Sequence, residues 1–132
     1  MKIVKNLEGK SDKTRRDIIC SYLNNLEIKY ETQEYYSGVN IIASSGKSLE
    51  IGVASHFDAV SNSPGANDNA SAVAVTLEVL RRYHRHPLKN IGIRGFFFDE
   101  EESGLVGSKA YVKNNSLDSL LGVYNMELVG NG

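Results

Sequence analysis

Two stretches of this chain, SHFDAVSNSPGANDNAS (residues 55–71) and FFFDEEESGLVGS (residues 96–108), decide how the rest is interpreted. The first places His56, Asp58 and Asp68 on a loop rich in Gly, Pro and Asn, between an apolar run and a helical run. The second ends a run of three phenylalanines with four consecutive acids. His, Asp and Glu are usual protein ligands of hard or borderline divalent cations. The two stretches together therefore favour a metal-dependent hydrolase.

Each signal also has a purely structural explanation. Asp and Asn in a Gly-rich loop are normally turn formers, and Asp68 suits the N-cap of the helix that follows. A run of acids is usually a solvated loop. The three phenylalanines, however, predict a buried strand, so the acids Asp99–Glu102 reach the edge of the core. Four acids there repel one another at neutral pH, and a bound cation removes that cost.

Working outward, the hydrophobic periodicity predicts alternating helices and strands. Ser11 is expected to cap a helix that continues to Leu26, with Asp12 in its first turn. The turn at residues 44–47 predicts an antiparallel hairpin between the strands that flank it. The predicted strands are 28–36, 39–45, 49–55, 91–98 and 121–128, and the two later helices are 70–83 and 104–113.

This order of elements predicts an α/β protein with a mixed central sheet. Ligands of such sheets bind at the carboxyl ends of the parallel strands. His56, Glu101 and Glu102 fall just beyond two such ends, so we expect these three side chains to lie in one site.

Composition restricts the class of protein. The 132 residues suit one domain, and a net charge of -1 with scattered basic residues indicates neither nucleic acid nor an anionic membrane as a partner. The single cysteine, Cys20, excludes an internal disulfide. No run approaches the roughly 20 apolar residues that span a bilayer, and the N-terminus lacks the apolar stretch of a signal peptide. We therefore expect a cytoplasmic protein.

Four motifs carry a resemblance to a known family. His56-Phe-Asp58, Gly65–Ser71 and Glu101–Ser108 resemble, in order and spacing, the M28 family of zinc aminopeptidases. A fourth motif, Tyr124–Gly130, carries Glu127 where relatives usually have Asp. The resemblance runs from about residue 49 to the C-terminus. It implies a zinc-exopeptidase-like, three-layer α/β sandwich that acts on peptide substrates.

The resemblance also implies a role for each matching position. Asp58 would accept the second imidazole N–H of His56 and fix its tautomer, and Glu101 would be the general base. Asp68 would bridge two zinc ions, and its peptide bond to Asn69 would be cis. Asp99 and Glu100 would be supporting residues. The metal ligands implied in this way are His56, Asp68, Glu102 and Glu127.

The family's fifth ligand, a histidine, is expected beyond Gly132. Residues 1–132 are therefore interpreted as one partial catalytic domain, truncated at its C-terminus. One zinc site would be complete, with His56, Asp68 and Glu127, whereas Asp68 and Glu102 alone would serve the other. Apolar surface left uncovered by the truncation favours a homo-oligomer.

Three functions follow from these observations. The leading one is removal of N-terminal residues from peptides by a metal-activated water, with Glu101 as the base. The alternative is a catalytically impaired remnant that binds metal or peptide ends as an interaction module. Glutaminyl cyclisation ranks third, because such enzymes use tryptophan in the substrate pocket and this chain has none. His84 and His86 are expected to be solvated residues at a helix end, where cations suit the dipole.

Overall fold

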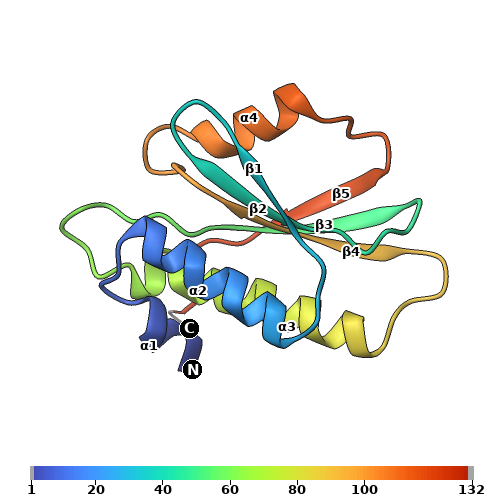
Figure 1. Ribbon diagram of the computed structural model, residues 1–132, viewed down its shortest axis with the longest axis horizontal. Coiled ribbons are helices and arrows are strands. Elements are labelled where there is room, and N and C mark those ends of the chain that lie inside the picture. Colours follow the sequence, from blue (N-terminus) through green and yellow to red (C-terminus); the bar gives the residue numbers. More distant parts are fainter. Residues whose placement is uncertain (1, 131–132) are drawn as a thin grey trace.

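The computed structural model describes residues 2–130 and consists of helices on both faces of one sheet (Figure 1). Short polar connections join most elements, and the longest one carries residues 57–65. An irregular turn, Ala66–Ala70, leads directly into the third helix. In chain order the elements are α1 (Lys2–Leu7), α2 (Asp12–Asn25), β1 (Glu31–Glu34), β2 (Val39–Ala43), β3 (Glu50–His56), α3 (Ser71–Arg85), β4 (Gly92–Phe98), α4 (Val106–Asn114) and β5 (Leu120–Asn125).

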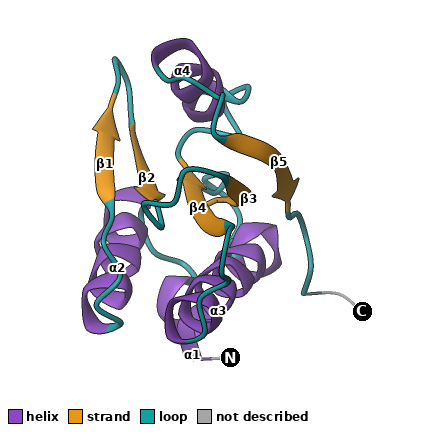
Figure 2. Ribbon diagram, turned by 90° about the vertical axis from the view of Figure 1, so that its right-hand side faces the viewer, coloured by secondary structure: helices purple, strands orange, loops and turns teal. Residues whose placement is uncertain are grey.

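The five strands of the described chain form one mixed sheet in the order β1-β2-β4-β3-β5. β3 runs parallel to both β4 and β5, and β2 runs antiparallel to both β1 and β4. α1, α2 and α3 cover one face of the sheet, and α4 covers the other (Figure 2). The predicted α/β fold, a three-layer sandwich around a mixed sheet, is confirmed.

The predicted hairpin between residues 39–45 and 49–55 is wrong. β2 and β3 do run in opposite directions, but β4 lies between them. Their short connection passes over the start of β4 at Gly92, where a Cβ atom would overlap the side chain of Ser45. The phenylalanine-rich β4 gains the central position because both of its faces can be buried there. The turn residues between β2 and β3 cannot indicate that β4, which follows about forty residues later, will lie between these two strands.

Most predicted elements appear with shifted ends. The side chain of Ser11 caps α2, accepting a hydrogen bond from the backbone N–H of Thr14 at 3.2 Å, as predicted. β1 is only four residues long, because it is an edge strand with mostly exposed side chains. β5 ends at Asn125, so Glu127 lies in the segment after the strand. The sequence prediction missed α1, which buries Ile3 and Leu7 in the core.

The two faces of the sheet are packed unequally. Between the sheet and α1–α3 lies the larger core, which includes Leu7, Ile19, Val73 and Phe97. Between the sheet and α4 lies a small cluster centred on Phe96 and Tyr111, whose rings meet edge to face with centroids 4.9 Å apart. Burial on the first face supplies most of the hydrophobic stabilisation.

The parallel pairing of β3 and β4 positions the candidate site. His56, the last residue of β3, is paired with Phe98, the last residue of β4. The ladder continues for one more step, because the backbone N–H of Phe57 donates to the carbonyl oxygen of Phe98 at 3.0 Å. The loop after β3 and the acidic segment after β4 therefore leave the sheet side by side.

Candidate metal centre

His56 is the centre of a cluster of carboxylates at this end of the sheet. Its side chain is 2% exposed. The Nε2 atom lies 3.2 Å from Oδ1 of Asp68 and 3.2 Å from Oε2 of Glu127. Oε2 of Glu101 lies 3.7 Å from the same nitrogen. One nitrogen and three carboxylate oxygens, taken from four separate segments, thus converge on one point.

Asp58 holds the other side of the imidazole ring. Nδ1 of His56 lies 3.2 Å from Oδ1 of Asp58 and 3.2 Å from its carbonyl oxygen. Because both oxygens are acceptors, Nδ1 carries a proton and Nε2 faces the carboxylates. The two carboxylate oxygens of Asp58 also accept the backbone N–H groups of Glu101 and Glu102, each at 3.0 Å. Asp58 therefore fixes the histidine and the acidic segment together.

The charges around His56 favour a cation at this position. Burial by itself lowers the pKa of His56, but the hydrogen bond with Asp58 and the charges of Glu127, Asp58 and Glu101 outweigh it and raise the pKa to about 9. Burial likewise tends to raise the pKa of Asp58, yet hydrogen bonds from His56 and from two backbone N–H groups lower it below its ordinary value.

The pKa values of the two glutamates in the acidic segment are raised, whereas that of Asp58 is lowered. Burial, followed by the charges of neighbouring carboxylates, raises the pKa of Glu101, although His56 opposes this. Burial and then the charge of Asp68 raise the pKa of Glu102. Ionised carboxylates at this end of the sheet therefore repel one another, as the sequence predicted, and a positive ion would relieve that repulsion.

Two groups of side chains in the described part of the chain could each hold a metal ion. One is His56 with Asp68 and Glu127, and the other is His56 with Glu101 and Glu102. Within each group the ligand atoms lie within 4.8 Å of one another. His56 is the member that both groups share, whereas the family resemblance assigns the bridging position to Asp68. The bridging role of Asp68 stays a prediction.

The ligand atoms suit zinc in both chemistry and spacing. Zinc binds imidazole nitrogen and carboxylate oxygen, and ligands about 2.0–2.1 Å from it at tetrahedral angles are roughly 3.3 Å apart. Nε2 of His56 lies 3.2 Å from an oxygen of Asp68 and 3.2 Å from an oxygen of Glu127. The second nitrogen of the histidine is held by a carboxylate, which is the usual support of a zinc-bound imidazole. The residues present therefore fit a zinc ion.

Asn69 links two of the segments that build the site, and the sequence reasoning missed this role. The peptide bond between Asp68 and Asn69 is cis, as the resemblance implies. The fully buried amide of Asn69 donates to the carbonyl oxygen of Met126 at 3.0 Å and accepts the backbone N–H of Leu128 at 3.3 Å. These two bonds bracket Glu127 and hold it opposite Asp68.

Asn40 and Asp99 support the acidic segment from the β2 side. The buried amide of Asn40 donates to the carbonyl oxygen of Gly107 at 2.8 Å and accepts the backbone N–H of Asp99 at 3.1 Å. Asp99, also buried, accepts the backbone N–H of Val39 at 3.1 Å. The supporting role predicted for Asp99 agrees with these contacts. A polar residue inside an apolar strand was the one sequence signal that pointed to Asn40.

A cavity of about 470 Å³ lies beside the candidate site, on the α4 face of the sheet. His56, Glu101 and Glu127 form its polar end, and Phe96, Tyr111 and neighbouring apolar side chains form the rest. The candidate metal centre is therefore open to a ligand from the sparsely packed face. The fold accounts for this opening, because α4 is the only described helix on that side.

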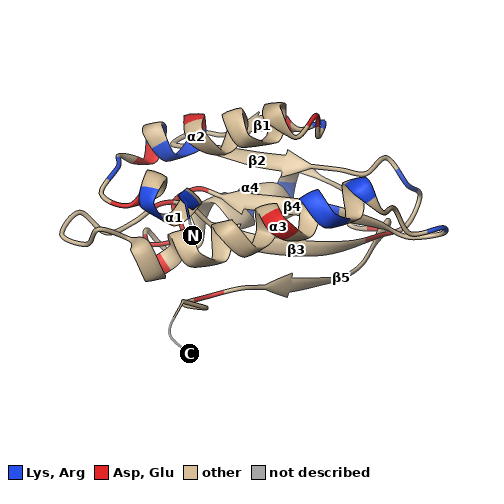
Figure 3. Cartoon of the chain, turned by 90° about the horizontal axis from the view of Figure 1, so that it is seen from below, with Lys and Arg blue, Asp and Glu red and all other residues tan. Residues whose placement is uncertain are grey.

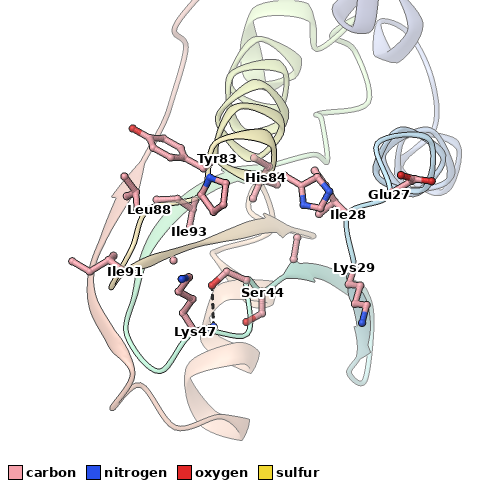
Figure 4. Close-up of a pocket in the computed structure, with 15 residues that line it drawn as sticks. Glu27, Ile28, Lys29, Ser44, Lys47, Tyr83, His84, Leu88, Ile91 and Ile93 are labelled. Carbon is pink, nitrogen blue, oxygen red and sulfur yellow. Dashed lines mark hydrogen bonds between the residues drawn. The ribbon is translucent and has the colours of Figure 1, made fainter.

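A second cavity, of about 340 Å³, lies at the opposite end of the sheet (Figure 4). His84 projects into it from the end of α3 beside Ile28, and Lys47 lies across from them on the β2–β3 connection. Neither metal-binding group of the described residues includes a side chain from this cavity. His84 is exposed in the last turn of α3, as predicted for a solvated helix end.

Basic residues are distributed over several elements. Figure 3 shows Lys and Arg on α1, on α2, in the last turns of α3 and on loops, with no single basic face. The absence of a nucleic-acid partner stays a prediction. No helix of the described residues is long and apolar enough to cross a bilayer. The cytoplasmic location stays a prediction.

The comparison with known protein families gives a direct result. The profile of peptidase family M28 matches residues 40–132. The chain belongs to peptidase family M28. The match begins slightly before the stretch identified from the motifs and contains every candidate ligand. The metal-ligand roles of these residues stay a prediction.

Individual M28 relatives agree with this assignment. A probable lipoprotein aminopeptidase, LpqL, from Mycobacterium tuberculosis is 38% identical over 87 residues, which cover 64% of this chain and 17% of the relative. The solved structure of BSAP, a zinc aminopeptidase from Bacillus subtilis, is 36% identical with a TM-score of 0.62 and covers 70% of this chain and 25% of its own. The chain spans less than a fifth of the length of the first curated relatives it matches.

The same fold occurs with a different chemistry. The structure of a glutaminyl cyclase from Bacteroides thetaiotaomicron has a TM-score of 0.80 with this chain at 22% identity, covering 97% of this chain and 60% of the cyclase. A likeness at that identity concerns the fold alone. Function therefore has to be argued from the side chains at the carboxyl ends of β3 and β4.

Proposed function

We propose that this chain is part of a zinc-dependent aminopeptidase that removes N-terminal residues from peptides. The observation that carries the proposal is the convergence of Asp68, Glu127 and Glu101 on Nε2 of His56. Membership of the M28 family supports peptides as the substrate class. The chain spans less than a fifth of the length of its first curated relatives. The activity is therefore proposed for the whole protein.

In this proposal His56, Asp68 and Glu127 would hold one zinc ion, and Asp68 and Glu102 would contribute to a second. Asp58 keeps the imidazole in the tautomer that offers Nε2 to the ion. Zinc, when bound, supplies a Lewis acid that polarises the scissile carbonyl and lowers the pKa of water. The buried histidine and its carboxylate partner give the complete site its rigidity.

Glu101 is the proposed general base. Its side chain is partly exposed, and its carboxylate lies beside His56 at the mouth of the apolar cavity. Burial and neighbouring acids raise the pKa of Glu101, which makes it a better proton acceptor than an ordinary glutamate. Glu101 would take a proton from the attacking water and pass it to the leaving amine.

The proposed site would also select the end of a peptide. A free N-terminal amine can bind a metal ion or pair with a nearby carboxylate of the site, and an internal peptide bond has no such amine. We therefore propose exopeptidase rather than endopeptidase activity.

Glu101→Gln is the decisive variant. In the full-length protein we expect kcat for release of an N-terminal residue to fall by about 10²–10⁴-fold, with zinc content unchanged. Glu78→Gln, an exposed acid on α3, is the control and should leave kcat as it is. If the wild-type protein releases no N-terminal residue with zinc present, or releases it equally well after chelation, the enzymatic proposal fails.

The remnant hypothesis gives a different result in the same preparation. Metal analysis that finds about one ion per chain without turnover would support a binding module, whereas two ions with turnover would support the enzyme. Self-association also stays a prediction. Exposed apolar side chains on α4 and β5, among them Val112, Leu121 and Val123, support this prediction, and sedimentation velocity would test it.

A further inference from the structure

Arg15 is the largest fully buried side chain of the described residues, with 1% of its surface exposed. It lies on α2, far in sequence from every motif that suggests function. Burying an arginine is costly unless its N–H groups are paired. Its partners therefore show what this charge does in the fold.

All hydrogen bonds recorded for the Arg15 side chain go to backbone carbonyl oxygens. Nε donates to Lys10 at 3.1 Å. Nη1 donates to Phe57 at 3.2 Å and more weakly to Gly65 at 3.5 Å, and Nη2 donates to Pro64 at 2.8 Å. The planar fork of a guanidinium can satisfy several acceptors in one plane, which an ammonium cannot do.

Three of these carbonyls belong to the loop 57–65, at its two ends. Phe57 lies between His56 and Asp58, and Gly65 opens the turn that carries Asp68. Arg15 thus connects the start of the loop, beside the histidine ligand, to its end, three residues before the aspartate ligand. One side chain therefore contacts both ends of the loop.

A second residue of α2 contacts the same loop, and Gly65 leaves room for Arg15. Oδ1 of Asp12 accepts the backbone N–H of Ala59 at 3.3 Å. Gly65 has a φ of +63°, and a Cβ atom at that position would overlap the guanidinium of Arg15. Glycine is therefore required at residue 65 both by its backbone conformation and by the approach of Arg15.

We propose that Arg15 is a positioning residue for the metal centre, whose guanidinium ties the two ends of the loop 57–65 so that Asp68 faces His56. The proposal rests on the proposed zinc site but concerns a residue outside it. Arg15 touches neither substrate nor ion. It acts through the backbone of Phe57, Pro64 and Gly65.

The test is zinc affinity, measured by competition with a chromophoric chelator, in the full-length protein. Arg15→Ala should weaken zinc binding by about 10–100-fold, the range found when residues that orient metal ligands are removed. Millimolar guanidinium should restore part of the affinity to this variant. Arg15→Lys should remain weak, because a single ammonium cannot span the two ends of the loop.

Two control variants separate positioning from general stability. Leu23→Ala removes a fully buried side chain from the same helix and destabilises the core through a cavity. Arg16→Ala removes the neighbouring arginine, which is only half-buried. At a temperature where all variants are folded, both controls should bind zinc as the wild type does. Equal loss in Arg15→Ala and Leu23→Ala would overturn the proposal.

Hydrogen exchange gives a readout that needs neither zinc nor turnover. In the metal-free protein, amides of residues 57–65 should exchange faster in Arg15→Ala and Arg15→Lys, but not in Leu23→Ala. Unchanged exchange in both Arg15 variants would overturn the positioning role. If the wild type bound no zinc, the proposed function would fail, while exchange of the loop would still decide whether Arg15 holds it.

Discussion

Strand β3 has a buried acid near each of its ends, and the two acids differ in their surroundings. At the start, Glu50 accepts hydrogen bonds from Nε and Nη2 of Arg94 at 2.9 and 2.6 Å and from the backbone N–H and hydroxyl of Ser45, both at 2.7 Å. Beyond the end, Asp58 is paired with His56, and its charge also acts on Arg15 and on the acids Asp99, Glu101 and Glu102. In residues 2–130, no salt bridge joins a Lys or Arg to Asp58, Asp68, Glu101, Glu102 or Glu127.

The difference separates a neutralised structural pair from a cluster with an excess of acids. The acid at the start of β3 is neutralised within the chain, so it contributes to folding and needs nothing else. The acids at the end exceed the one histidine that faces them, so the folded chain bears repulsion that only an added cation relieves. Retaining such repulsion costs stability, which is the usual cost of a functional site.

Breaking the pair at the start of β3 should have the largest effect. Arg94→Met leaves Glu50 buried without its counter-charge, and removing one partner of a buried pair costs about 3–5 kcal/mol. We expect the free energy of unfolding in urea to fall by that amount, while the folded fraction binds zinc normally. Arg81→Met, which breaks an exposed pair with Glu78 on α3, should change little. A similar loss in both variants would contradict the comparison.

Lowering the pH should disrupt the same pair by protonating Glu50. Burial by itself raises the pKa of Glu50, but hydrogen bonds from Ser45, Arg94 and Ser44 outweigh it and hold the pKa below its ordinary value of 4.5. A carboxylate whose folded pKa is lowered contributes stability that is present above the unfolded pKa and lost as the pH falls through the folded one.

We therefore expect the unfolding free energy of the metal-free protein to decrease from about pH 4.5 downward, with Glu50 as one contributor. Glu50→Gln should be less stable at neutral pH and should have a shallower acid limb. Urea unfolding at a series of pH values would measure both. Parallel acid limbs in the two proteins would exclude Glu50 as a source of the slope.

Asn69 offers a test at the other end of the strand. Asn69→Ala removes the part-buried hydrogen bonds to the carbonyl of Met126 and from the N–H of Leu128, and a bond of this kind contributes about 0.5–1.5 kcal/mol. Zinc affinity should also fall, because Glu127 lies between those two groups. Asn114→Ala removes an exposed amide on α4 and serves as the matched control. Unaltered zinc affinity in Asn69→Ala would show that Glu127 is not held by these bonds.

The variant with the smallest expected effect should increase, rather than decrease, the stability of the metal-free protein. Glu102→Gln removes one charge from the crowded cluster, so the metal-free protein should become more stable, by about 0.5 kcal/mol or less at this exposed position. The same variant should bind less zinc. Asp118→Asn, an exposed acid outside the cluster, should change neither quantity. A metal-free Glu102→Gln protein that is less stable than the wild type would show that the cluster is not repulsive.

The site was largely readable from the sequence because its members lie at the ends of strands. His56 and Glu101 follow two apolar runs, and parallel strands bring such positions to one edge of a sheet. The pairing of β3 with β4 places them there. The supporting residues were not readable in this way. Arg15 and Asn69 bind backbone groups 42 to 59 residues away, and a backbone carbonyl leaves no trace in the sequence.

The elements of the fold also differ in whether local or distant residues determine them. Helix α2 was predictable because its capping residue and its apolar face are local. The hairpin was mispredicted because the choice between pairing β2 with β3 or with β4 depends on which strand can bury both faces. That choice is made by Phe96 and Phe97, far along the chain.

By themselves, the amino-acid types and their order identified the family and most of the helices and strands, and they predicted the candidate ligands, since each short motif is made of residues that are neighbours in sequence. The tertiary structure alone decided that β4 separates β2 from β3, that a buried arginine on α2 ties both ends of the loop 57–65, and that an asparagine brackets Glu127. The physical reason is that these depend on which distant backbone groups share a buried volume, and each must find a partner there.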